Sequence, residues 1–258
     1  MSGIPVTMPQ PRTSTGVYGL DRLIGGGFPS HRAILLRGAP GTGKTMFGLQ
    51  FLKDGLDNGD RGALVSVDER PEHVIADADS FGWDVAGAIS AGIVTVLDAS
   101  PFFTATRRRG WGPSGVDARQ VSTDLIQQIR AIGARRLVID SLTSLIPMDM
   151  SLADAQNHLR SIVQSLEGNF GCTTLMTWRT QPADDPLWSG HMAEYLASGV
   201  LELKLSQSGR ALTRSIVLRK LRATHFDPGE YPLVLDRWTG LSVGQPSAGG
   251  AVRELAAV

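Results

Sequence analysis

The stretch AILLRGAPGTGKTMFGLQFLKDGL (33–56) decides the fold of this chain. Its first six residues form a short apolar run that is typical of a buried strand, and residues 44–56 carry apolar side chains at helical spacing. Between them, GAPGTGKT (38–45) matches the P-loop pattern G-x-x-x-x-G-K-[ST] in full. A strand, a glycine-rich loop and a helix in this order predict a phosphate-binding turn in an α/β protein.

The P-loop residues have roles that follow from their chemistry. Glycine-rich backbone lets successive N–H groups turn toward phosphate oxygens, and the positive end of the following helix faces the same point. We expect the Lys44 ammonium to reach the β- and γ-phosphates of a nucleotide, and the Thr45 hydroxyl to bind Mg²⁺. The alternative is a glycine-rich turn that holds a lysine by chance. The chain has only four lysines against 21 arginines, which disfavours chance at this position.

Three carboxylates are predicted at the same edge of the sheet. Asp140 ends an apolar run at the carboxyl end of a strand, where ligands bind in open α/β sheets, and we expect it to hold Mg²⁺ beside Thr45. Asp68 and Glu69 end the strand that follows the P-loop helix, and a glutamate there is long enough to orient water at a γ-phosphate. The alternatives are an aspartate that caps the next segment and a solvated acidic turn before Pro71.

The rest of the chain alternates apolar runs with amphipathic stretches. Two C-terminal hairpins are predicted over 199–222 and 231–243. Strand–helix alternation followed by hairpins predicts an α/β fold, with a mostly parallel twisted sheet flanked by helices and an antiparallel extension. The other predicted strands are 33–38, 62–69, 93–100, 135–145 and 172–178, and the predicted helices are 44–56, 71–82, 121–133 and 151–168.

Several segments together resemble the KaiC branch of the RecA-like ATPases. STGVYGLDRLIGGGFP (14–29) resembles the opening short helix and glycine-rich turn of that family, and VSVDERPEHVIADADSFGWD (65–84) resembles its paired-carboxylate strand and following helix. KLRATHFDPGEYPLVL (220–235) is the most specific match, because a Lys-x-Arg run before Gly-Glu-Tyr-Pro is not a general P-loop feature. The resemblance implies a RecA-like ATPase domain over 15–243. Residues 1–14 hold three prolines and no periodicity, which predicts an N-terminal arm, and residues 244–258 are predicted to form a C-terminal tail.

The resemblance also implies a ring, usually a hexamer, with ATP bound between adjacent subunits. It implies Glu69, with Asp68 beside it, as the hydrolytic carboxylates; the family commonly has Glu-Glu here, and the shorter aspartate reaches less far. From the residues alone, Lys220 and Arg222 read as a solvated strand edge. The resemblance implies nucleotide contacts by Gly38, Gly41, Thr42, Gly43, Lys44, Thr45 and Met46, by Ser80 on the base side, and by Lys220, Leu221, Arg222 and Thr224 in the site of the neighbouring subunit.

Composition excludes several classes of protein and of metal site. The 258 residues hold 25 basic and 25 acidic side chains and one cysteine, which excludes an internal disulfide framework and a cysteine-rich zinc site. The five histidines show no metal-ligand spacing. No apolar run approaches the roughly 20 residues that cross a bilayer. We therefore expect a cytoplasmic protein. Its nucleotide is ATP by what the resemblance implies, and Mg²⁺ is expected from Thr45 and Asp140.

The sequence leaves three classes of function open. The first is an ATPase ring that couples hydrolysis to conformation or to a regulatory protein partner, and the second is a nucleotide-stabilised binding module with little turnover. The third is a RecA-type DNA-binding ATPase; zero net charge disfavours it, although Arg107–Arg109 and Trp111 form a basic-aromatic cluster on a predicted loop. The pattern favours a solvated loop for that cluster, and the alternative is a segment that docks to a partner or to a neighbouring subunit. A protein kinase shares the P-loop, but the sequence indicates no acceptor.

Overall fold

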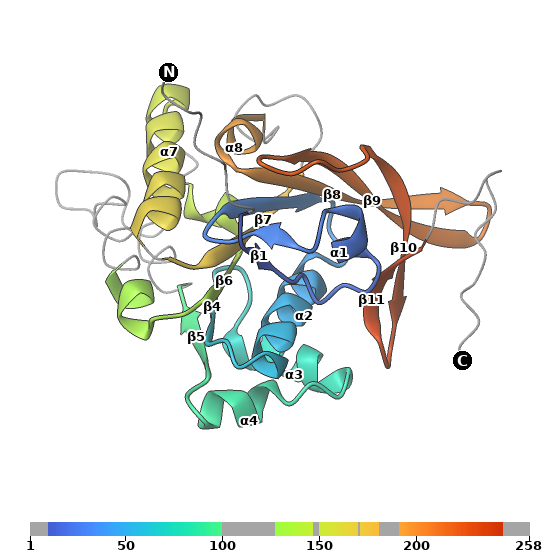
Figure 1. Ribbon diagram of the computed structural model, residues 1–258, viewed down its shortest axis with the longest axis horizontal. Coiled ribbons are helices and arrows are strands. Elements are labelled where there is room, and N and C mark those ends of the chain that lie inside the picture. Colours follow the sequence, from blue (N-terminus) through green and yellow to red (C-terminus); the bar gives the residue numbers. More distant parts are fainter. Residues whose placement is uncertain (1–9, 100–126, 147–149, 170, 181–190, 245–258) are drawn as a thin grey trace, which may run out of the picture.

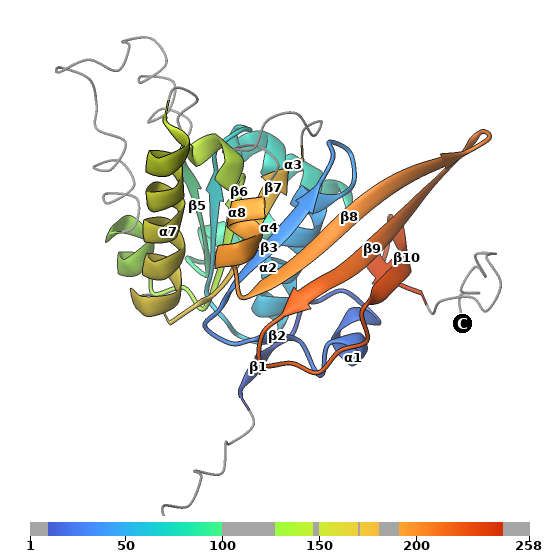
Figure 2. The same cartoon turned by 90° about the horizontal axis from the view of Figure 1, so that it is seen from above.

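A nine-stranded sheet carries the P-loop at the end of its central strand (Figure 1, Figure 2). The computed structural model describes residues 10–99, 127–146, 150–169, 171–180 and 191–244. The strand order is β11-β10-β9-β8-β3-β7-β6-β4-β5, in which β8 to β5 are parallel and β8 to β11 are antiparallel. This arrangement confirms the predicted α/β fold with C-terminal antiparallel hairpins.

Helices and strands are interspersed along the described chain as far as residue 196, and the described elements after it are all strands. The strands are β1 (Arg12–Thr13), β2 (Phe28–Pro29), β3 (Ala33–Gly38), β4 (Gly62–Ser66), β5 (Val94–Asp98), β6 (Arg136–Asp140), β7 (Thr173–Arg179), β8 (Gly199–Ser208), β9 (Ala211–Leu221), β10 (Gly229–Asp236) and β11 (Gly240–Val243). The helices are α1 (Leu20–Leu23), α2 (Lys44–Asp57), α3 (Pro71–Ser80), α4 (Val85–Ser90), the 3₁₀ helix η1 (Leu142–Leu145), α7 (Leu152–Asn169) and α8 (His191–Leu196).

Three predicted strands were too long at their carboxyl ends. The strand predicted over 62–69 ends at Ser66, the one predicted over 93–100 ends at Asp98, and the one predicted over 135–145 ends at Asp140. Leu142 and Leu145 continue the apolar pattern, but they form the 3₁₀ helix η1 and bury their side chains in the core. Of the helix predicted over 121–133, the described part is helical over 127–132. The short helices α4 and α8 were not predicted.

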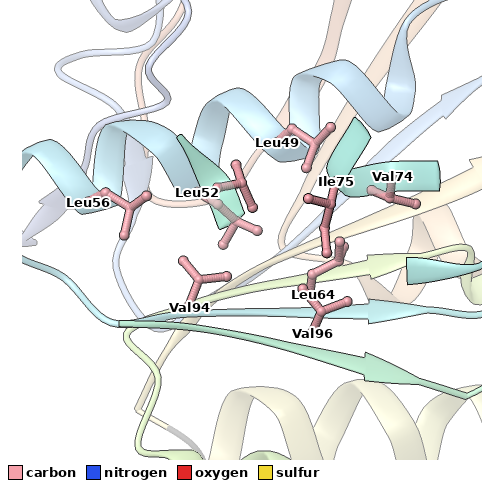
Figure 3. Close-up of a pocket in the computed structure, with 9 residues that line it drawn as sticks. Leu49, Leu52, Leu56, Leu64, Val74, Ile75, Val94 and Val96 are labelled. Carbon is pink, nitrogen blue, oxygen red and sulfur yellow. The ribbon is translucent and has the colours of Figure 1, made fainter. Parts of the chain in front are cut away.

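Helices cover both faces of the sheet. Figure 1 shows α2, α3 and α4 on one side and α7 with α8 on the other, each over its own apolar cluster. Figure 3 shows the apolar side chains between α2, α3 and strands β4 and β5. The space left among them is about 10 Å³ and offers no polar partner to a water molecule, so it is core packing rather than a ligand site. Among the described residues, no helix has both the length and the apolar character to cross a membrane.

Arg136 ties the N-terminal segment to the core. Its side chain is 2% exposed, and its guanidinium donates to the Ser14 carbonyl (2.9 Å), to the carboxylate of Asp54 (2.8 Å) and to that of Asp60 (3.1 Å). The guanidinium carbon also lies 4.9 Å from the centre of the Phe51 ring, a distance typical of a cation–π contact. Ser14, near the start of the described chain, is therefore held against α2 and β6.

Replacing Arg136 with methionine is expected to lower the free energy of unfolding by about 3 kcal/mol, because two carboxylates lose their buried partner. Urea denaturation of the nucleotide-free protein measures this. Arg135→Met is the matched control. Arg135 also pairs with Asp60, at 3.7 Å, but its side chain is 78% exposed, so its loss should cost less than about 1 kcal/mol. Equal effects of the two substitutions would contradict the anchoring role of Arg136.

Candidate functional site

The P-loop is shaped by glycines that other residues could not replace. Gly41 and Gly43 have φ angles of 78° and 106°, in the left-handed region that favours glycine. A Cβ atom on Gly38 would lie 2.6 Å from the Leu203 carbonyl oxygen, so β3 and β8 meet closely where the loop begins. Thr42 is fully buried and donates its hydroxyl to the Ala39 carbonyl at 2.8 Å. The loop is thus held in shape by its own residues.

Lys44 spans the loop from the first turn of α2. Its ammonium donates to the carbonyl oxygens of Gly38 and Ala39, both at 2.9 Å. Burial lowers the pKa of Lys44, and the neighbouring Arg179 lowers it further, against the opposing effect of Asp140 and Asp68. An anion in the loop would favour the charged ammonium, and so the site gains electrostatically when phosphate oxygens approach.

Close packing of α2 on β6 brings Thr45 to Asp140. A Cβ atom on Gly48 would lie 2.8 Å from a methyl carbon of Val138, so only glycine lets the helix approach this strand so closely. One turn earlier, the Thr45 hydroxyl donates to an Asp140 carboxylate oxygen at 2.7 Å, and Thr177 donates to the other oxygen. A carboxylate and a hydroxyl are hard oxygen ligands that fit Mg²⁺, which usually completes its shell with water and substrate phosphates.

The two acidic residues after β4 are in different environments. Asp68 accepts hydrogen bonds from the hydroxyls of Ser141, at 2.7 Å, and Ser144. The Glu69 carboxylate accepts no hydrogen bond from the described residues, although its backbone carbonyl accepts one from Ser66 at 2.6 Å. Partial burial raises the pKa of Glu69, and the nearby Asp140 raises it further. Glu69 therefore has open oxygens and increased basicity.

These residues surround one open pocket at the carboxyl edge of the sheet, called here the P-loop pocket. It brings together six of the residues predicted from the sequence and adds three that were not, Pro40, Ser141 and Arg179. The residues that line it are Pro40, Gly41, Lys44, Thr45, Asp68, Glu69, Asp140, Ser141 and Arg179.

Other predicted contacts lie outside this lining. Met46 is partly buried against the apolar cluster beneath α2. Ser80 is exposed at the end of α3, where its hydroxyl donates to the Asp77 carbonyl at 2.7 Å. Gly38, Thr42 and Gly43 belong to the backbone of the loop rather than to the lining, and Arg107–Arg109 fall outside the described residues.

The residues predicted to act on a neighbouring subunit lie at the other end of the strands from the P-loop. Lys220 is at the end of β9, and its ammonium donates to the α8 carbonyl oxygens of Glu194 (2.8 Å) and Tyr195 (3.1 Å) and to that of Ala197 (2.7 Å). Arg222 also donates to the Tyr195 carbonyl, at 3.2 Å.

Strand register explains why these residues do not reach the P-loop of their own chain. Leu221 pairs with Gly199 at the start of β8, and Gly199 pairs with Ile34 near the start of β3, whereas the P-loop follows the end of β3. The hydroxyl of Thr224 is held on the same side by the Arg12 guanidinium at 2.6 Å. Within one protomer, this segment and the P-loop pocket therefore lie at different ends of the strands.

Two arginines near the P-loop were missed by sequence reasoning. Arg179 ends β7, and its position after an apolar strand run, like that of Asp140, could have indicated the same sheet edge. Arg214 on β9 donates to the Gly41 carbonyl at 3.4 Å. No local pattern marks Arg214, because its place depends on the antiparallel pairing of β8 with β9.

Comparison with known proteins agrees with this geometry. The model of the KaiC ATPase family matches residues 13–248. A UPF0273 protein of Pyrobaculum aerophilum is 33% identical over 229 residues, which cover 88% of this chain and 80% of that protein. The circadian clock oscillator protein KaiC of Synechococcus elongatus is 32% identical over 222 residues, which cover 86% of this chain and 42% of the clock protein.

The fold itself is also found among solved structures. The crystal structure of a KaiC-like protein from Pyrococcus horikoshii superimposes with a TM-score of 0.76 at 28% identity, covering 92% of this chain and all of that chain. A family match over most of the length, relatives of similar size and a shared fold all agree with the P-loop and its surrounding carboxylates. The chain belongs to the KaiC family of ATPases.

Proposed function

We propose that this protein binds and hydrolyses ATP with Mg²⁺, and that it works as a homo-oligomeric ring in which nucleotide state controls conformation or binding of a regulatory protein partner. The observation that carries the proposal is the P-loop pocket, where Lys44, the Thr45–Asp140 pair and Glu69 converge from separate elements. Phosphoryl transfer to water needs these parts together, namely a phosphate cradle, a metal site and a group that orients water.

Each residue has a defined task in this proposal. The backbone N–H groups of residues 41–46 and the Lys44 ammonium bind the phosphates, and Glu69 orients and deprotonates the attacking water. Thr45 and Asp140 would hold Mg²⁺, whose charge would offset that of the phosphates. Asp68 holds Ser141 and Ser144 beside the water site, which is a supporting task.

We further propose that Lys220, Leu221, Arg222 and Thr224 complete the nucleotide site of an adjacent subunit. These residues lie at the other end of the strands from the P-loop. This position supports the proposal, because in a head-to-tail ring each subunit presents one end of its sheet to the P-loop of the next subunit. Two cations supplied in trans neutralise charge on the transferring phosphoryl group. The number of six subunits, the base-side role of Ser80 and the domain limits 15–243 rest on the family resemblance, and a cytoplasmic location rests on the composition.

Native mass measurement with and without ATP and Mg²⁺ tests the ring. A subunit of 27.6 kDa is expected to assemble into a species of about six times that mass when nucleotide is present, because ligand bound between subunits favours the assembled state. Lys44→Ala, which removes the phosphate ligand, is the control and should remain unassembled. A single subunit under every condition would contradict the ring.

Two further assays on the same samples, phosphate release and binding of single-stranded DNA, test the other two classes of function. A ring that forms with ATP but releases no phosphate indicates a nucleotide-stabilised binding module. Retention of single-stranded DNA at low salt indicates a RecA-type DNA-binding ATPase, because phosphate contacts are strongest at low ionic strength.

A further inference from the structure

Arg179 lies where the strand order places the far end of a bound triphosphate. It is the last residue of β7, which runs between the P-loop strand β3 and the Asp140 strand β6, and it pairs in register with Gly38. Side chains alternate along a strand, and Thr177 points to Asp140 on the α2 face while Met176 belongs to the cluster on the other face. Arg179 therefore points to the α2 face, toward the P-loop pocket.

The partner that Arg179 has in this structure is a weak one. Its guanidinium lies 3.9 Å from an Asp68 carboxylate oxygen, and its side chain is 51% exposed. Asp68 is already bound by the Ser141 and Ser144 hydroxyls. A long ion pair at an exposed side chain contributes little to stability, so this contact leaves the Arg179 guanidinium available to another partner.

Two cationic side chains face the P-loop pocket, and an anion bound between them would relieve their repulsion. Arg179 and Lys44 both line the P-loop pocket, and their mutual repulsion is among the effects that lower the pKa of Lys44. A guanidinium is a planar fork of N–H donors that matches two phosphate oxygens. The P-loop lysine contacts the β- and γ-phosphates, and the side of the pocket beyond it, toward Asp140 and Glu69, is the side that Arg179 faces.

We propose that Arg179 binds the terminal phosphate of the nucleotide held by its own protomer. To reach it, Arg179 gives up its ion pair with Asp68. In this way the pocket distinguishes a nucleoside triphosphate from a diphosphate. The inference rests on the proposed nucleotide binding but goes beyond it, because it assigns the recognition of one phosphate group to one side chain. It also gives Asp68 a second state, in which only the two serine hydroxyls remain bound to it.

Titration calorimetry with ATPγS and with ADP, each with Mg²⁺, tests the assignment. Arg179→Gln is expected to weaken ATPγS binding roughly 10- to 100-fold, as expected for lost charge-assisted hydrogen bonds, and to change ADP binding less than about threefold. Arg179→Lys should recover part of the loss, since it keeps the charge without the fork. Arg135→Gln, an exposed arginine at the opposite end of β6, is the control and should change neither affinity.

The outcomes separate this inference from the proposed function. If the unmodified protein binds neither nucleotide, the proposed function fails and the inference with it. If it binds both, and Arg179→Gln weakens both equally or neither, the inference alone is wrong.

A double-mutant cycle tests the exchange of partners directly. Asp68→Asn removes the competing carboxylate and is expected to tighten ATPγS binding several-fold in the original background. The gain should be smaller in the Arg179→Gln background, because that variant has no guanidinium for Asp68 to hold away from the phosphate. A gain of the same size in both backgrounds would show that Asp68 acts on the phosphate by its own charge, and the exchange would be wrong.

Discussion

Lys44→Ala is expected to weaken nucleotide binding by roughly 10²- to 10⁴-fold and to abolish ATP hydrolysis at accessible concentrations. Two charge-assisted hydrogen bonds from the ammonium to phosphate oxygens account for this range. In this structure the Lys44 ammonium donates instead to the Gly38 and Ala39 carbonyl oxygens. Binding of a fluorescent ATP analogue and a phosphate-release assay measure the two effects.

The chain offers a close control for this substitution. Lys53 lies on the same helix, two and a half turns later, and pairs with Asp57 at the surface. Lys53→Ala should leave nucleotide affinity and turnover unchanged, because its charge faces solvent far from the loop. If Lys44→Ala turned over ATP at the unmodified rate, the P-loop would not be the site of hydrolysis.

The fold could be predicted where local pattern and burial agree. The run AILLRG forms β3 over its full length, because it is apolar, short and followed by glycine. The pattern failed where apolar residues are buried without forming a strand. Leu142 and Leu145 look like a continuation of β6, yet Asp140 has turned to Thr45 and Thr177, and the chain leaves the sheet as a 3₁₀ helix. Burial alone does not distinguish these two conformations.

From the sequence, only those site residues could be predicted that directly follow a recognisable strand. Asp140 and the Asp68–Glu69 pair each end an apolar run, which is sufficient to place them at the carboxyl edge. The sequence does not show that Asp68 accepts hydrogen bonds from Ser141 and Ser144 while the Glu69 carboxylate accepts none from the described residues, because those serines lie just before and within η1, 73 and 76 residues further along the chain. Arg214 and Lys220 likewise depend on the pairing of β8 with β9, a long-range contact that no local pattern encodes.

Glu69→Gln is expected to retain ATP binding within a few-fold and to lower hydrolysis by roughly 10²- to 10⁴-fold. The amide keeps the size of the side chain and removes the base. Single-turnover hydrolysis and equilibrium binding, measured on the same protein, separate the two effects. Glu72→Gln, on the exposed first turn of α3 and outside the pocket lining, is the control and should hydrolyse ATP normally.

The pH dependence gives a second readout of the same residue. Burial and the nearby Asp140 raise the pKa of Glu69, and a base acts only when deprotonated, so kcat/KM should fall with decreasing pH earlier than it would for a solvent-exposed glutamate. This acidic limb should vanish in Glu69→Gln. If Glu69→Gln kept the rate while Asp68→Asn lost it, the base would be Asp68. That result would require Asp68 to give up the hydroxyls of Ser141 and Ser144 before it could accept a proton from water, a cost that Glu69 does not bear.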